Sequence, residues 1–266
     1  MRYYITPGKH GLGWRPDIPD QRDYIFEAKV ALAKATRTVL PEKVDLRSGF
    51  ADVYDQGQLG SCTANALAAA FDFDRHKEGR SHTAPSRLFI YWNERNLEGT
   101  VDSDAGAAIR DGVKVLVKLG ASPETDWPYD IAKFTDKPNK KSYEDALKNQ
   151  LLTYQRILRP ADDPLHDMLS CLASGYPFVT GISIYESFES EKTARTGIIP
   201  LPAQDERLIG GHAVVVVGYL QHKKQFICRN SWGVDWGDGG YFYIPYKYLE
   251  NQSLATDQWL LRTVEV

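Results

Sequence analysis

Cys62 is the residue whose type and position most favour covalent chemistry. It opens the stretch CTANALAAAFDFDRHKEG, where five alanines and the spacing of Leu67 and Phe71 predict a helix that ends near Gly79. Unpaired N–H groups and the positive end of the helix dipole stabilise a thiolate at such a position. The sequence therefore predicts a nucleophilic thiol, although a small buried residue would leave the same pattern.

A thiolate nucleophile needs a base, and the base needs a group that orients it. His212 follows two glycines and opens the apolar run HAVVVVGYL, so its imidazole is expected at the start of a buried strand. Asn230 ends a second strand, QFICRN, and its amide oxygen can hold one imidazole nitrogen while an indole such as Trp232 excludes water. Considered alone, His212 could also be a histidine of the hydrophobic core. The segment after Asn230 could equally be a structural turn rich in aromatic residues.

The other cysteines and histidines lack such settings. Cys171 falls inside a predicted helix and Cys228 inside a predicted strand, so we interpret both as packing residues. Three cysteines are too few for a disulfide scaffold, and because the number is odd at least one is free. The remaining histidines show no spacing typical of metal ligands and are expected at the surface: His10, His76, His82, His166 and His222. No metal site is predicted.

The elements that must position these residues change character along the chain. Besides the helix that begins at Cys62, helices are predicted at residues 86–96, 107–119, 143–149 and 164–174. The β-branched and aromatic runs PFVTGISIY, HAVVVVGYL, QFICRN and GYFYIPY come later and predict strands. Helices first and strands afterwards favour an α+β protein of two lobes over a doubly wound fold.

Three segments follow from this order. We expect an N-terminal arm at 1–40, a mainly helical lobe at 41–155 that bears the cysteine, and a mainly β lobe at 156–266 that bears the histidine and asparagine. The arm is rich in turn formers and contains one helix-compatible stretch, 23–38, that would be marginal on its own.

The composition and net charge of the chain exclude some classes of binding partner. The 266 residues are 42% hydrophobic, enough for a sizeable core, and the formal net charge of −3 argues against a nucleic-acid or anionic membrane partner. No apolar run approaches the length of a membrane span, and the start MRYYITPGKHGLGW lacks the features of a signal peptide. We expect a monomer, with the cytoplasm favoured and non-classical secretion left open.

The segments DQGQLGSC, GGHAVVVVGY and RNSWGVDWGDGGYFYI together resemble the papain family of cysteine peptidases. The lead-in PEKVDLR is similar to the start of a mature enzyme of that family, and the resemblance covers residues 41 to about 250. In the family the histidine and asparagine follow the cysteine by about 130–150 residues. Here they follow it by 150 and 168, so the histidine fits and the asparagine lies slightly beyond.

The resemblance implies a papain-like two-lobe α+β fold, with the active site in a cleft between a helical lobe and a β-barrel-like lobe. It implies that Cys62 forms an acyl-enzyme, His212 acts as acid and base, Asn230 orients the imidazole and Gln56 completes the oxyanion hole. Neither a metal nor another cofactor is required. The residues expected to bind a peptide or protein substrate are Gly106, Gly181, Gly210, Gly211 and Trp232.

The sequence departs from the family pattern at several positions. Leu59 replaces one half of the usual disulfide and Thr63 the aromatic residue beside the nucleophile, so a disulfide-free enzyme suited to a reducing compartment is expected. Gly211 stands where plant members often carry Asp, so their pH behaviour is not carried over. Gly181 and Gly210 are small, which predicts a roomy apolar subsite between them.

The arm and the reaction each leave alternatives open. Papain-type zymogens carry an inhibitory propeptide across the cleft, but this arm is shorter than the usual eukaryotic one and lacks its helical motif. A segment that occupies its own cleft and a permanently packed surface extension are equally compatible with its apolar, turn-rich sequence. The resemblance favours an endopeptidase. A transpeptidase or deamidase that uses the same acyl-enzyme, and a non-catalytic peptide-binding relative, are the alternatives.

Overall fold

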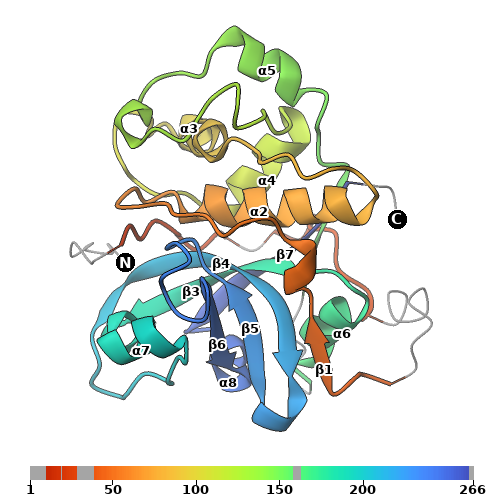
Figure 1. The fold of residues 1–266 in the computed structure, drawn as a ribbon, viewed down its shortest axis with the longest axis vertical. Helices are drawn as coiled ribbons and strands as arrows, with labels where there is room; N and C mark the ends of the chain where they lie inside the picture. Colours follow the sequence, from red (N-terminus) through yellow and green to blue (C-terminus); the bar gives the residue numbers. More distant parts are fainter. Residues whose placement is uncertain (1–9, 19, 29–38, 158–162, 264–266) are drawn as a thin grey trace.

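A helical layer and an antiparallel sheet face each other, and the N-terminal segment runs between them (Figure 1). This computed structural model describes residues 10–18, 20–28, 39–157 and 163–263. The helix expected at 23–38 lies largely outside these residues. In the helical layer are α2 (Cys62–Lys77), α3 (Arg87–Glu98), α4 (Ile109–Lys118) and α5 (Lys140–Ala146), with the short 3-10 turns η1 (Arg47–Gly49) and η2 (Ile131–Lys133).

The sheet has seven strands in the order β2-β7-β3-β4-β5-β6, with β1 added beside β4. Their bounds are β1 (Lys43–Asp45), β2 (Thr153–Arg156), β3 (Phe178–Tyr185), β4 (Leu208–Leu220), β5 (Gln225–Arg229), β6 (Tyr241–Pro245) and β7 (Ala255–Arg262). All the pairings are antiparallel. Strands β1 and β2 come from the segment expected to form the helical lobe, because the chain begins and ends that segment on the sheet.

Smaller helices accompany the strands of the second half. They are α6 (His166–Ala173), η3 (Glu186–Glu189), α7 (Glu191–Thr196), η4 (Gln221–Lys223) and α8 (Tyr246–Glu250). Cys171 lies in α6 and Cys228 in β5, and both are buried in one hydrophobic cluster, as predicted for packing residues. All three cysteines are free.

Strand β4 is the element that joins the two layers. Its Val214 and Val216 pack into the cluster on the outer side of the sheet, whereas Val215 and Val217 pack into the cluster that includes the alanines of α2. Side chains alternate between the faces of a strand, so a strand buried on both faces requires an unbroken apolar run, which the sequence HAVVVV supplies. The predicted α+β architecture of two lobes is confirmed, and it places the start of α2 against the start of β4.

Candidate active site

Cys62 is the first residue of α2 and its side chain is fully buried. The preceding residue, Ser61, makes no side-chain cap of the helix. Its hydroxyl instead lies 2.6 Å from the hydroxyl of Tyr129, and its carbonyl oxygen accepts a hydrogen bond from the side-chain amide of Asn65 at 3.0 Å. The peptide that carries the Cys62 N–H is therefore held from both sides.

His212 lies on β4 and Asn230 immediately after the neighbouring strand β5. His212 Nε2 and Asn230 Oδ1 are 2.8 Å apart, and the Ser231 N–H donates to the same Oδ1 at 2.9 Å. An amide oxygen only accepts, so Nε2 carries the proton and Nδ1 is left with a lone pair. The indole of Trp232 stacks on the imidazole with ring centroids 4.7 Å apart and shields this hydrogen bond from water.

The two halves of the site meet where α2 faces β4. The backbone of Ala213, the residue after His212, lies close enough to the Cys62 thiol to lower its pKa, and so does the backbone of Gly13 and Trp14. His212 Nδ1 has no hydrogen-bond partner within the part of the chain that the structure describes. The strand that carries the base thus runs past the nucleophile, and the base is in the tautomer that can take a proton.

The predicted acidic thiol is not what this structure holds. Burial raises the pKa of Cys62 to about 11, and the N–H groups around the sulfur offset only part of that effect. Burial likewise lowers the pKa of His212 to about 4, against a smaller opposing effect of its hydrogen bond to Asn230. The prediction that the helix N-terminus makes this thiol acidic was wrong for this state. Water is excluded from the thiol, and the cost of burying a thiolate outweighs the effect of the helix dipole. Both groups are neutral near pH 7.

Gln56 is fully buried, and its side chain is held at both ends. The Ser231 hydroxyl donates to Oε1 at 2.5 Å, so Nε2 points away from Ser231 and donates to the carbonyl oxygens of Leu59 and Gly11 at 2.9 and 3.0 Å. The Tyr129 hydroxyl donates to the Gln56 backbone carbonyl at 3.0 Å. A donor fixed in this way is suited to hold a developing oxyanion.

The arm occupies this site. The Gly11 N–H donates to Gly57 O at 3.2 Å, and the Trp14 N–H donates to Gly211 O at 3.1 Å. Further along, the Ala107 N–H donates to Gly13 O at 2.8 Å and the Arg15 N–H donates to Ala107 O at 3.0 Å. Residues 11–15 therefore form a strand-like segment bound by backbone hydrogen bonds to both layers.

Two glycines let the arm approach so closely. A Cβ atom on Gly13 would lie 1.8 Å from the carbonyl oxygen of Gly60, and one on Gly11 would lie 2.3 Å from that of Leu59. Both distances are far below van der Waals contact, and the opposing atoms are backbone. Only glycine fits these two positions while the arm stays in place.

Each residue predicted to bind substrate borders the arm. Trp14 lies over Gly181, where a Cβ would come within 1.9 Å of the indole, and against Gly211. Gly210 faces the Leu12 side chain at 3.0 Å, and Gly106 faces Gly13 O at 1.9 Å, both measured from a Cβ built on the glycine. Trp232 stacks on the His10 ring, with centroids 4.2 Å apart. The space that the small Gly181 and Gly210 leave is filled here by apolar arm residues.

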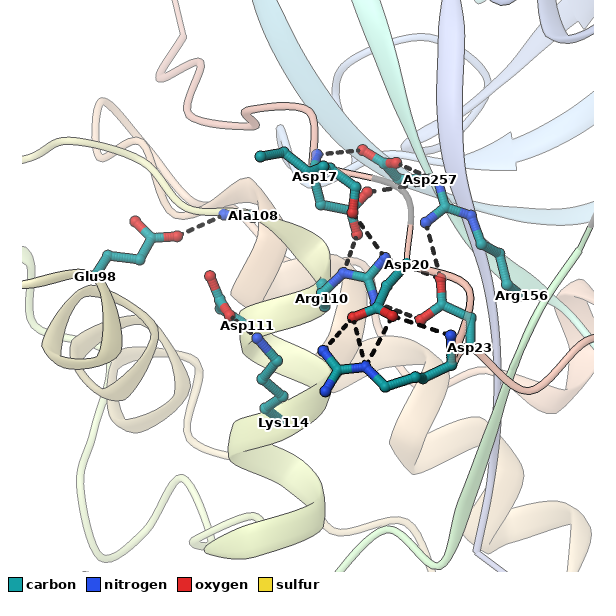
Figure 2. Close-up of polar contacts among 12 residues, drawn as sticks. Asp17, Asp20, Asp23, Glu98, Ala108, Arg110, Asp111, Lys114, Arg156 and Asp257 are labelled. Carbon is teal, nitrogen blue, oxygen red and sulfur yellow. Dashed lines mark hydrogen bonds and ion pairs between the residues drawn. The ribbon is translucent and has the colours of Figure 1, made fainter.

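A buried ionic cluster anchors the arm beyond the cleft (Figure 2). Arg110 of α4 pairs with Asp17 at 3.2 Å and with Asp23, whose second oxygen accepts at 2.9 Å. Arg156 of β2 lies 3.3 Å from Asp23 and 2.9 Å from Asp257 of β7, and the Asp17 N–H donates to Asp257 at 3.1 Å. The cluster therefore joins the arm to both layers.

The ionic cluster contains more carboxyl groups than guanidinium groups. Three carboxyl groups with side chains at most 5% exposed face two guanidinium groups. Burial, and then the neighbouring carboxyl of Asp257, raise the pKa of Asp17 to about 8, while Arg156 and Arg110 act in the opposite direction. One proton retained by this carboxyl leaves two negative charges for two arginines.

Sequence reasoning missed Tyr129, Ser231, Arg110 and Arg156. Ser231 lies within the quoted RNSWG segment but has no spacing that reveals its partner. Tyr129, Arg110 and Arg156 are distant in sequence from every residue that they hold, so no local pattern could identify them. The predicted substrate-binding residue Gly106 lies in the segment VDSDAGAAIRDG, and the next residue, Ala107, pairs with the arm backbone.

No helix in residues 10–18, 20–28, 39–157 or 163–263 is long and apolar enough to cross a membrane. Nor do these residues contain a group of three or more His, Cys, Asp or Glu side chains able to hold a metal ion.

Comparison with known proteins identifies the family. The family description "Papain family cysteine protease" matches residues 40–259. An uncharacterized peptidase C1-like protein of Acanthamoeba polyphaga mimivirus is 41% identical over 95% of this chain and 87% of its own. Cysteine proteinase 3 of Entamoeba histolytica is 29% identical over 88% of this chain and 69% of its own.

Solved structures agree with this assignment. Xylellain, a cysteine protease from Xylella fastidiosa, superposes with a TM-score of 0.88 at 43% identity, over 98% of this chain and 99% of its own. The digestive procathepsin L 3 of Tenebrio molitor shares the fold, with a TM-score of 0.69 at 20% identity over 96% of this chain and 76% of its own. The predicted papain-like fold is confirmed. The chain belongs to the papain family of cysteine peptidases and is a hydrolase.

Proposed function

We propose that this peptidase cleaves internal peptide bonds through a Cys62 acyl-enzyme. The observation that carries the proposal is the neutral His212, with Nε2 bonded to Asn230 and Nδ1 unpartnered beside the residue that touches the Cys62 thiol. In the open cleft, Nδ1 takes the thiol proton and the thiolate attacks the substrate carbonyl carbon. His212 then protonates the leaving amine and afterwards activates the water that releases the acyl group.

Gln56 and the Cys62 backbone N–H stabilise the oxyanion in this scheme. Loss of one such donor typically costs about 10²–10³ in rate. The clamp on Gln56 by Ser231 supports this role, because it fixes the direction of Nε2 before substrate arrives. The donor is already used by Gly11 O in the present state, so a substrate must displace the arm to reach it.

The same contacts support the arm as an intrinsic inhibitor. Its backbone takes the hydrogen-bonding groups of Gly211 and Ala107, Trp14 covers Gly181, and the Cys62 thiol is fully buried. A closed chain therefore offers neither a thiolate nor a free oxyanion donor. We infer that the chain is a zymogen-like form that becomes active when the arm leaves.

The proposal is tested with the full chain carrying Gly13→Ala, which cannot keep the arm in place. We expect it to hydrolyse fluorogenic peptides and to be labelled by an epoxide inhibitor at Cys62, whereas the added substitution Cys62→Ala abolishes both. Mass spectrometry of the products, with and without an added amine, separates hydrolysis from transpeptidation. Binding of peptides without cleavage or labelling would support the non-catalytic alternative instead.

A further inference from the structure

Arg110 and Arg156 form a cationic site that belongs to the body of the enzyme rather than to the arm. The guanidinium carbons lie 5.1 and 5.2 Å from the ring centroid of the buried Trp259, so the same indole holds both side chains in place. Arg156 also pairs with Asp257. None of these contacts involves the arm, so both arginines remain positioned when the arm leaves.

Departure of the arm changes the charge of this site. It removes the carboxyl groups of Asp17, Asp20 and Asp23 together with Arg15 and Arg22, which lie on the same segment.

What remains are two guanidinium groups and the carboxylate of Asp257, a net charge of +1. The nearby Asp111 and Lys114 of α4 pair with each other at 2.7 Å and add no net charge. Glu98, the other nearby acid, loses its partner Arg15 but keeps its hydrogen bond to the Ala108 N–H at 2.9 Å. Among the described residues outside the arm, Asp257 is the acid that pairs directly with a guanidinium group of this site, so one carboxylate faces two positive charges there.

The site lies on the path of a peptide in the cleft. Trp14 of the arm lies against Gly181 and Gly211, and the next residue, Arg15, pairs through its backbone with Ala107. Asp17, three residues beyond Trp14, then contacts the arginines. An extended peptide that anchors an apolar side chain in the Trp14 pocket and follows the same groove brings a residue within reach of the two guanidinium groups.

We propose that Arg110 and Arg156 form a distal subsite that selects an acidic side chain of the substrate. This inference rests on the proposed peptidase function and adds a substrate class to it: peptides with an aromatic or large apolar anchor and a carboxylate a few residues away. Two arginines beside one buried carboxylate, that of Asp257, leave one guanidinium charge for a substrate carboxylate to pair with. A buried charge is tolerated when it is paired and is costly when it is not. Asp17 and Asp23 occupy that subsite in the closed chain.

The test uses full chains in which the site is vacant. Gly13→Ala, Asp17→Ser and Asp23→Ser are combined so that the arm loses both its cleft and its anchor contacts. Fluorogenic peptides carry one fixed aromatic residue, and a single Asp is walked over the positions on either side of it, each matched by a peptide with Asn. We expect kcat/KM to be about tenfold higher for Asp than for Asn at one position, and about equal for the two residues at the other positions.

Arg110→Gln and Arg156→Gln should each lower kcat/KM for the Asp peptides more than for the Asn peptides, and so reduce that ratio towards one. The matched control Lys114→Gln removes a positive charge one helical turn from Arg110 and should keep the ratio. High salt should weaken the preference in the parent chain, a measurement that does not depend on the arginine variants folding.

The outcomes separate the two proposals. An Asp to Asn ratio near one at every position, or a ratio that survives both arginine substitutions, would show that the pair serves only to hold the arm. Binding of the same peptides to a Cys62→Ser chain is measured by fluorescence anisotropy. If the Asp peptides bind more tightly than the Asn peptides but the chain that retains Cys62 does not hydrolyse them, the subsite is supported and only the peptidase proposal is overturned. If neither binding nor hydrolysis favours Asp, the subsite is overturned.

Discussion

The side-chain amide of Gln56 donates to the carbonyl oxygen of Gly11 at 3.0 Å, so the donor suited to an oxyanion is occupied by the chain's own arm. The same amide is oriented by Ser231 and, like Cys62, is fully buried. One hydrogen bond thus links the state of the arm to the state of the catalytic groups, and the predictions below follow from that link.

Displacing the arm should raise activity. Gly13→Ala places a Cβ 1.8 Å from Gly60 O, so the arm cannot stay in the cleft. We expect peptide turnover by the full chain to rise about tenfold or more, since each ~1.4 kcal/mol of lost docking free energy increases the open fraction about tenfold. The control Ile18→Ala alters an arm side chain that is 86% exposed and should leave turnover unchanged. Equal rates for the two variants would contradict an inhibitory arm.

Alkylation of Cys62 should report the same opening. A thiol with a pKa of about 11 is about one part in 10⁴ ionised at pH 7, so iodoacetamide should modify the closed chain slowly. Gly13→Ala removes the cover that raises this pKa and should speed modification of Cys62 by about tenfold or more. Peptide mass spectrometry gives the rate, with the buried Cys171 and Cys228 as internal controls that stay unmodified while the chain is folded.

Tyr129→Phe should impair the oxyanion hole without weakening substrate binding. The lost hydroxyl contacts both Ser61 and the Gln56 carbonyl, so the two donors are no longer fixed relative to each other. In the Gly13→Ala chain we expect kcat to fall about tenfold, less than the loss of a whole donor, with KM within about twofold.

The matched control for this change is Tyr143→Phe, which removes a hydroxyl that donates to Asn93 in the same layer but away from Gln56. Both substitutions should lower the free energy of unfolding by about 1–3 kcal/mol. Only the first should lower kcat. A fall in kcat that merely tracks the loss of stability in both variants would contradict the positioning role.

Docking of the arm should weaken as pH rises. The pKa of Asp17 is raised from 3.8 to about 8 in the docked state, so the docked arm binds the proton more tightly than the free arm does. The contribution of Asp17 is therefore complete below about pH 4 and is lost as pH rises through 8. Asp20, whose pKa is lowered by Arg22, changes protonation only below this range.

Asp17→Asn should remove this pH dependence, because an amide neither binds nor releases the proton. Hydrogen exchange of residues 10–18, normalised to the intrinsic rate at each pH, is compared from pH 6.5 to pH 8, above the range between the docked pKa of His212, about 4, and its ordinary value of 6.5. Protection should fall over this range in the unmodified chain and stay level in the variant. The same slope in both chains would assign the effect to other groups.

The sequence by itself determined the fold class, the helix that starts at Cys62, and the family through Cys62, His212, Asn230 and Gln56. Those features are local: alanine content and apolar periodicity predict helix and strand, and each motif lies within a few residues of the chain. The same is true of Cys171 and Cys228, whose burial follows from their neighbours.

Only the tertiary structure decided what surrounds those residues. Whether Cys62 is a thiolate depends on water, and water is excluded here by Gly13 and Trp14 of an arm that sequence left undecided between cleft and surface. Tyr129, Arg110 and Arg156 act on partners far away along the chain: Ser61 is 68 residues from Tyr129, and Asp23 is 133 residues from Arg156. Electrostatics and close packing depend on distance in space, which the order of residues does not specify until the chain is folded.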